Sequence, residues 1–235
     1  FPSAICITDH FHVIQELNRR VDRVRIRVQN RFRKTINTLK PKENNKTITP
    51  EEIVELEEAS RYYYVLKKFN WLLFSTNKKI LDVNVDRKFN RTLNRYLNYS
   101  EILDFMLAID DELEDAFYLR NDVTYFYDHC TYDTAKKQLE KIIIDFRSSP
   151  IAEMSPFANT LTNWKKEIIN SFIIVDDKAN RKMNTAIVEN RNKSIKLIKH
   201  ASNGYLNWER FRNRILYTLN EDTTFYYTSI RKDGK

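Results

Sequence analysis

The chain has 235 residues, a net charge of +8 and only two glycines, Gly204 and Gly234. Glycine-rich phosphate loops and tight β-hairpins need residues that tolerate positive φ, so this composition disfavours both and favours a mainly helical chain. The sequence contains no run of about 18 apolar residues, the length needed to span a membrane, and no signal peptide is visible. Two cysteines form no disulfide framework, and the sequence predicts a cytoplasmic protein without membrane contact.

The charge is distributed unevenly along the chain. Residues 1–46 hold 11 basic residues (Lys and Arg) against 4 acidic ones (Asp and Glu). The corresponding numbers are 17 against 23 in residues 47–180 and 12 against 5 in residues 181–235. Two basic ends therefore bracket an acidic middle. This pattern fits a polyanionic partner such as nucleic acid, with solvated basic faces as the alternative.

Ala4–Thr8 reads as a strand, and the sequence opens in the middle of it, so we expect a fragment of a longer protein.

The first strongly patterned segment follows this strand and is basic. From Phe11 to about Thr38, apolar residues recur at steps of three and four and predict one long amphipathic helix. These residues are Val13, Leu17, Val21, Val24 and Val28. Arg20, Arg23, Arg27 and Lys34 share one flank, where they could follow a phosphate backbone or be merely solvated.

A polar stretch with Pro41 predicts the end of this helix. Thr49 then reads as an N-cap, with Pro50 at the first helical position and Glu52 closing a capping box. Further helices are expected over 51–74, 77–97, 100–120 (capped by Ser100), 130–147 and 157–172. Aromatic runs within 61–74 and 122–130 are interpreted as core, with base stacking as the alternative.

The C-terminal part predicts two helices. In a helix from Ala186 to His200, one face carries Glu189, Asn192, Lys193, Lys196, Lys199 and His200. Gly204 supplies a left-handed stop, and Trp208–Leu219 forms the closing helix.

Two carboxylates suit metal chemistry. Asp9 directly follows the apparent strand, and Glu189 shares a helix face with lysines, so metal and phosphate ligands would converge if the two segments meet. Magnesium prefers carboxylate oxygens and keeps open positions for phosphate. From spacing alone, a helix-capping Asp9 and a solvated Glu189 are the favoured interpretation. A zinc site at Cys6, His10 and His12 would lack a fourth ligand.

Two segments carry a resemblance to a known family. "DHFHV" (Asp9 to Val13), followed by "LNRRVDRVR" (Leu17 to Arg25), resembles a motif and basic helix of bacterial insertion-sequence transposases of the ISL-three family. The closing segment resembles the same family at Glu189, Asn192, Ile195, Lys196, Ile198, Lys199, Gly204, Tyr205, Asn207, Phe211, Arg212, Arg214, Ile215 and Leu216.

This resemblance implies a fold and an activity. The expected fold is mainly α, the C-terminal part of an RNase H-like catalytic core interrupted by a large helical insertion. Residues 1–40 would form a core segment, 41–165 the insertion and 166–235 the return to the core. Asp9 would be the second aspartate and Glu189 the glutamate of a DDE triad that holds two magnesium or manganese ions for DNA cleavage and strand transfer.

The implied partners are the double-stranded DNA of transposon ends and target, and further copies of the chain in a homo-oligomer at full length. The expected location is the nucleoid. The predicted DNA contacts are Arg20, Arg23, Arg27, Asn192, Lys193, Lys196 and Lys199.

The chain departs from the family pattern at three single positions and at Asn184-Thr185, which replaces the usual Asn-Gly turn. His10, Asn190 and His200 stand where relatives usually carry arginine, glycine and arginine. The family's first aspartate and its DNA-binding domains precede the position of Phe1. We therefore expect the 235-residue chain to be inactive by itself, as a truncated or degenerate copy. A non-catalytic DNA-binding remnant and a helical interaction module remain alternatives.

Overall fold

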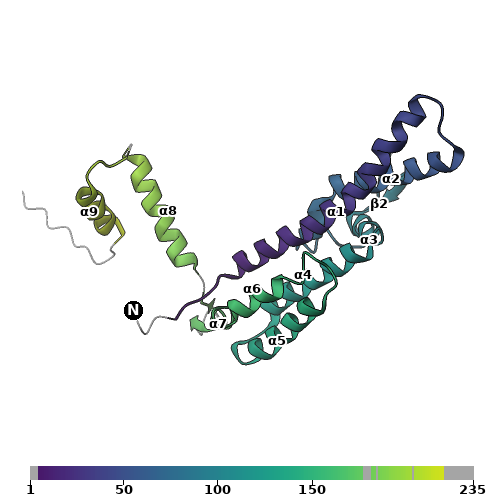
Figure 1. The fold of residues 1–235 in the computed structure, drawn as a ribbon. Helices are drawn as coiled ribbons and strands as arrows, with labels where there is room; N and C mark the ends of the chain where they lie inside the picture. The colour runs from purple at the N-terminus through teal and green to yellow at the C-terminus, as the bar shows by residue number, and fades with distance from the viewer. Residues whose placement is uncertain (1–4, 177–180, 184, 203, 220–235) are drawn as a thin grey trace, which may run out of the picture. The chain divides into compact units, whose positions relative to one another are not determined.

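The computed structural model describes residues 5–176, 181–183, 185–202 and 204–219 and is mainly helical (Figure 1). The chain forms two compact units, Phe1–Met183 and Asn184–Lys235. Among the described residues, no helix is both long and apolar enough to cross a membrane.

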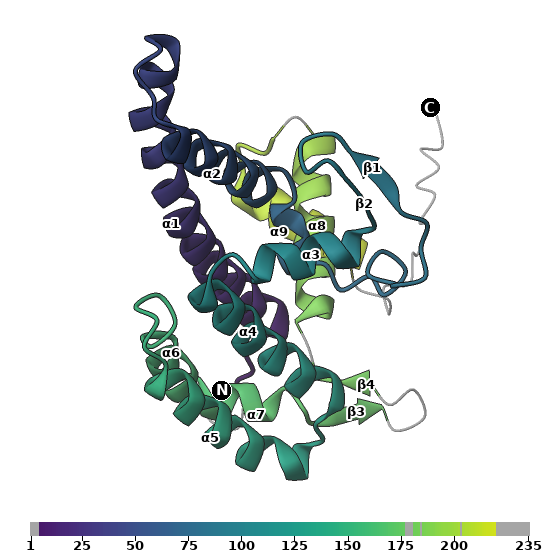
Figure 2. The ribbon, with the colours of Figure 1, turned by 90° about the vertical axis from the view of Figure 1, so that its right-hand side faces the viewer.

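The first unit is organised along α1 (His10–Asn44), against which α2 (Pro50–Lys68) and α4 (Asp111–His129) pack (Figures 1 and 2). The five apolar residues that predict this helix are all buried in the core, from Val13 to Val28. The predicted stripe is therefore confirmed.

The predicted end of α1 is wrong by about two turns. Pro41 lies inside the helix instead of ending it at once; the proline weakens the helix by removing a backbone hydrogen bond and crowding the preceding turn, and the helix ends soon after, at Asn44. Lys46 adopts a left-handed φ of 57°, and the Thr47 N–H donates to the Lys42 carbonyl at 2.9 Å. This turn leads the chain back towards α2.

The predicted capping box of α2 is confirmed. The Glu52 N–H donates to Thr49 Oγ1 at 3.3 Å, and the Thr49 N–H donates to Glu52 Oε2 at 3.1 Å. The α-helix ends at Lys68, and the rest of the predicted element continues as the 3₁₀ helix η1 (Asn70–Phe74).

The prediction of a helix over 77–97 is wrong. This segment carries an antiparallel hairpin of β1 (Lys88–Asn90) and β2 (Arg95–Leu97). Asn94 in the connecting turn has a φ of 50°. Asparagine tolerates the left-handed region, so it fills the role that the scarcity of glycine argued against.

The helix predicted over 100–120 is two helices, α3 (Tyr99–Leu107) and α4. Asn98, not Ser100, caps α3, because its Oδ1 accepts the Glu101 N–H at 2.9 Å while Glu101 Oε2 accepts the Asn98 N–H at 3.0 Å. A new helix, α4, then begins after Asp110, which caps it: Asp110 Oδ1 accepts the Leu113 N–H at 3.2 Å.

The next predicted helix is confirmed as α5 (Tyr132–Ser148). The helix predicted over 157–172 is divided at Trp164 into α6 (Phe157–Asn163) and α7 (Lys165–Asn170). A second antiparallel pair, β3 (Ile174–Asp176) and β4 (Arg181–Lys182), follows.

The strand predicted over Ala4–Thr8 is not formed in its described part, residues 5–8, and Ala4 lies outside the described residues. This segment is held against α7 instead. The Thr8 N–H donates to the Glu167 carbonyl at 3.2 Å, and Asn170 Nδ2 donates to the Cys6 carbonyl at 2.9 Å.

The second unit consists of α8 (Ala186–Ala201) packed on α9 (Trp208–Leu219), and both predicted helices are confirmed. Gly204 has a φ of 94°, and its N–H donates to the Lys199 carbonyl at 3.0 Å, so the predicted left-handed stop is also confirmed. Arg191 Nη1 donates to the Leu219 carbonyl at 2.6 Å and ties the two helices together.

Two buried arginines fix helices of the first unit to one another. Arg25 Nη1 donates to the Leu66 carbonyl at 3.0 Å and joins α1 to α2. Arg120 is 3% exposed; its Nε donates to Asn18 Oδ1 at 3.1 Å and its Nη2 to the Phe74 carbonyl at 3.3 Å. Burial lowers the pKa of Arg120, and neutral oxygens replace the water that its guanidinium loses.

We expect Arg120→Ala to destabilise the first unit by about 3 kcal/mol, because it opens a cavity and leaves buried acceptors without donors. Thermal unfolding followed by circular dichroism should show a fall in Tm of roughly 6 to 12 °C. Arg33→Ala, on the exposed side of α1, is the matched control. Equal losses in the two variants would contradict this role for Arg120.

Candidate functional site

Asp9 lies where the extended N-terminal segment enters α1. Its Oδ1 accepts the Phe11 N–H at 2.9 Å and caps the helix, and His10 Nδ1 lies 3.3 Å from the same oxygen. The Asp9 side chain is only 10% exposed. A carboxylate at a helix N-terminus is favoured by the helix dipole, so α1 fixes the position of this group.

Two buried hydroxyls accompany Asp9. Among the described residues, Thr8 Oγ1 and the Tyr127 hydroxyl have no hydrogen-bond partner. Burial and the nearby charge of Asp9 raise the pKa of Tyr127, so its hydroxyl remains protonated. Asp9 therefore lies beside hydroxyl groups whose hydrogen-bonding capacity is not used by the described part of the chain.

The Tyr127 ring is held firmly in place. It stacks on Phe172 with ring centres 5.7 Å apart and an interplanar angle of 2°. Lys182 Nζ donates to the Tyr127 carbonyl at 2.9 Å and lies 4.4 Å from the centre of the Phe172 ring. The β3–β4 hairpin thus contributes a cation that anchors the C-terminal end of α4.

Glu189 lies in the first turn of α8, in the second unit. Its side chain is exposed, and Thr185 Oγ1 donates to its Oε1 at 3.0 Å. The other residues of the predicted face are also exposed, namely Asn192, Lys193, Lys196, Lys199 and His200. Asp9 and Glu189 thus belong to different compact units, and their sharing one metal site stays a prediction.

The basic flank of α1 is partly used within the fold. Arg27 Nε donates to Glu153 Oε1 at 2.8 Å, and its Nη1 pairs with Glu112. These hydrogen bonds raise the pKa of Arg27. The hydrogen bond from Arg27 in turn lowers the pKa of Glu153. Arg20 Nη1 donates to the Glu153 carbonyl at 2.9 Å. A predicted DNA role for Arg20 and Arg27 would therefore compete with these internal contacts.

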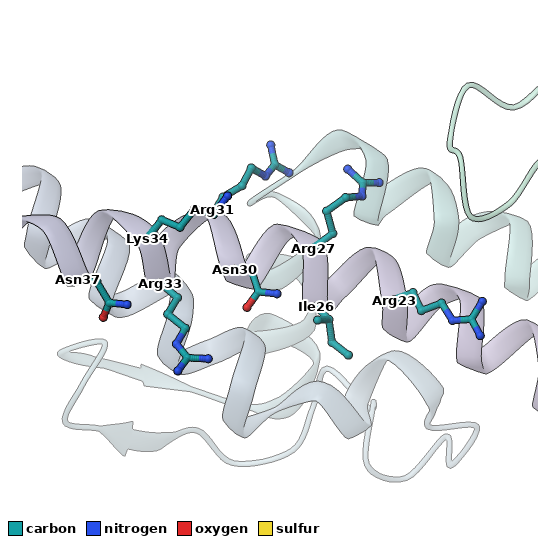
Figure 3. Close-up of a pocket in the computed structure, with 8 residues that line it drawn as sticks. All are labelled: Arg23, Ile26, Arg27, Asn30, Arg31, Arg33, Lys34 and Asn37. Atoms are coloured by element: carbon teal, nitrogen blue, oxygen red, sulfur yellow. The ribbon is translucent and has the colours of Figure 1, made fainter.

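Arg23 is more accessible than these two arginines. It is exposed, and it has no ion pair within the described part of the chain. Figure 3 shows it on α1 at one end of an open groove of about 600 Å³. The groove is lined by Arg23, Ile26, Arg27, Asn30, Arg31, Arg33, Lys34 and Asn37.

The fit to a divalent metal rests on donor type. Carboxylate oxygens are the ligands that Mg²⁺ prefers, and Asp9 and Glu189 both supply them. In the described residues, no three side chains of His, Cys, Asp or Glu are gathered as a metal cluster. Cys6, His10 and His12 are thus not gathered into such a cluster either, so the zinc alternative gains no support from the structure.

Sequence reasoning missed Thr8, Tyr127 and Lys182 as neighbours of the Asp9 region. The aromatic run around Tyr127 indicated core, and the ring is indeed packed, but periodicity gives no information on whether a phenol finds a hydrogen-bond partner. The one available signal was a tyrosine among phenylalanines, since a buried tyrosine hydroxyl normally needs a partner.

The comparison with protein families identifies the chain as a transposase. The model of the DDE transposases of the ISL-three type, described as "Transposase", matches residues 1–215, and the chain belongs to this family. No curated protein and no solved structure matches it. Membership implies DNA as a partner, and DDE transposases generally use divalent metal ions.

The capping geometry separates the structural role of Asp9 from a chemical one. Asparagine caps helices about as well as aspartate, whereas alanine costs about 1 kcal/mol. We expect Asp9→Asn to unfold close to the wild-type Tm and Asp9→Ala to unfold roughly 2 to 4 °C lower, measured by thermal denaturation. A Tm for Asp9→Asn as low as that of Asp9→Ala would show that the charge, not the cap, holds this helix end.

Proposed function

We propose that the chain carries two carboxylates of a DDE transposase that cleaves and joins DNA strands by metal-dependent phosphoryl transfer. The observation that carries this proposal is the family match, which spans both Asp9 and Glu189. Its further support is local: each carboxylate stands at the first turn of a helix, Asp9 as the cap of α1 and Glu189 in α8.

In this proposal, the core of the enzyme is RNase H-like. Residues 1–40 and 166–235 contribute to it, and residues 41–165 are a helical insertion. Asp9 and Glu189 would hold magnesium or manganese. When bound, such ions activate the attacking oxygen and stabilise the leaving oxygen of the phosphodiester.

The protein's own residues then have distinct roles. Asp9 is pre-positioned because the Phe11 N–H and the α1 dipole fix its carboxylate. The exposed lysines of α8 lie on the same helix as Glu189 and would bind phosphates near it. Oligomers of the full-length protein would bring transposon ends and target DNA together.

A non-catalytic DNA-binding remnant is the second candidate. The observation that favours it is His10, whose Nδ1 lies 3.3 Å from Asp9. The family pattern that the sequence resembles usually has arginine at this position. Loss of an always-charged group beside the carboxylate alters the electrostatics of the site.

The catalytic test uses the 235-residue chain and a version extended upstream to carry the family's first aspartate. We expect the short chain to be inactive in Mg²⁺-dependent strand transfer, because two carboxylates leave excess positive charge on two ions. In an active extended protein, Asp9→Asn or Glu189→Gln should abolish cleavage while leaving DNA affinity within about twofold, because the basic surface is unchanged.

Cleavage is read on a labelled transposon-end duplex, and binding on the same duplex in Ca²⁺. Strand transfer by the short chain, or by either substituted extended protein, would show that these carboxylates have been given the wrong role. An extended protein that binds DNA but never cleaves it would favour the remnant.

The lysines of α8 supply a separate prediction. Replacing Lys193, Lys196 and Lys199 by glutamine should weaken duplex binding and flatten the log–log salt dependence by up to about 2.7, at about 0.9 per phosphate contact. Lys136, Lys137 and Lys141, changed together to glutamine on α5, give a control with the same loss of charge. Fluorescence anisotropy across a salt series measures both triples, and equal slopes for them would contradict a specific role for α8.

A further inference from the structure

A basic arm interrupts the acidic middle of the chain. Residues 75–98 hold six lysines and arginines against two aspartates, whereas residues 47–180 as a whole are acidic. The β1–β2 hairpin lies within this segment, near α3 (Figure 2). None of the predicted DNA contacts lies here, so the arm is a second basic surface of the first unit.

A hollow of about 560 Å³ opens between this hairpin, the end of α2 and the start of α3. Both aromatic rings and cations line it. The side chains that matter for binding are Tyr64, Lys68, Phe69, Lys88, Phe89 and Arg91. Asp86 also lines the hollow, so three cations face one carboxylate.

The cations on the hairpin are available to a ligand. Lys88 and Arg91 are exposed, and neither has an ion pair among the described residues. Arg87 shows the contrast, because its Nε donates to Glu101 Oε2 at 3.0 Å. Glu101 pairs with Arg87 but not with Lys88 or Arg91, so the positive charges of Lys88 and Arg91 stay available beside the hollow.

The opposite wall combines a cation with aromatic faces. Lys68 Nζ donates to the Tyr64 hydroxyl at 3.0 Å and lies 5.2 Å and 5.7 Å from the ring centres of Tyr64 and Phe69. The ammonium group is therefore held at the aromatic wall, where it is still exposed to a ligand.

Phe89 offers an unusual apolar surface for a short hairpin. It is 49% exposed, lines the hollow and is supported by its cross-strand partner Tyr96, with ring centres 5.1 Å apart. A supported, exposed ring beside unpaired cations is the arrangement that proteins use for unpaired nucleotides: the ring stacks on a base, and the cations bind phosphates.

We propose that this hollow binds an unpaired nucleotide of a DNA strand, with its base against Phe89 and its phosphates at Lys88, Arg91 and Lys68. The inference rests on the proposed function only in taking DNA as the partner. A paired base buries its faces in the duplex stack, so the hollow distinguishes single-stranded DNA from blunt duplex.

The test measures anisotropy of the full 235-residue chain with a blunt duplex and with the same duplex carrying a single-stranded extension. Phe89→Ala should weaken binding to the extended duplex about tenfold and leave the blunt duplex unchanged, whereas Phe89→Tyr should retain affinity. Arg91→Ala should lower the salt slope on the extended duplex by about 0.7.

Two control variants accompany this test. Arg95→Ala removes the same charge from the hairpin at a position that does not line the hollow, and Tyr132→Ala removes an aromatic ring of equal exposure, 49%, from α5. Both should bind the extended duplex as wild type does. Circular dichroism confirms that each variant is folded.

Two results would overturn the proposal: Phe89→Ala with wild-type affinity for the extended duplex, or Arg91→Ala and Arg95→Ala with equal effects. Blunt-duplex binding that persists in either case would leave the proposed transposase function standing. Wild-type chain that binds neither duplex would instead remove DNA as the partner and overturn both.

Discussion

The first unit depends on one continuous apolar stripe along α1. Leu17, Val21, Val24 and Val28 are fully buried, and helices far apart in sequence cover them. Each such side chain contributes about 1.5 to 3 kcal/mol on burial, so the stripe gives α2 and α4 a common surface. The buried guanidinium groups of Arg25 and Arg120 then fix how those helices lie on α1, because each donates to fixed backbone or amide oxygens.

Signals that depend on local chemistry predicted the fold well. Periodicity located α1, α5, α8 and α9, and the chemistry of Thr49 and Gly204 located the start of α2 and the end of α8. The failures share a cause: a break that costs little locally leaves a periodic pattern intact. Asn94 replaced glycine in a hairpin turn, and Asp110 restarted a helix within an apparently unbroken pattern. Periodicity records which faces are apolar, but not where the backbone turns.

The candidate site divides in the same way. Asp9 and Glu189 were found because a motif places them, and the cap at Asp9 was one of the readings that spacing allowed. The partners of Arg27 were beyond reach, since Glu153 lies 126 residues further along the chain and only the fold brings it near. The same holds for Tyr127 beside Asp9. A sequence displays charges and hydroxyls, but whether each is already satisfied is decided by packing.

The length of α1 has a mechanical consequence. At 35 residues it is about 52 Å long, with Asp9 at one end and the turn into α2 at the other. Beyond Val28 only Leu39 is buried along it, so nearly half of the length of the helix contributes little to the core. Over this length, a difference of a few degrees in the direction of α1 at Asp9 corresponds to a displacement of several ångströms at the turn into α2.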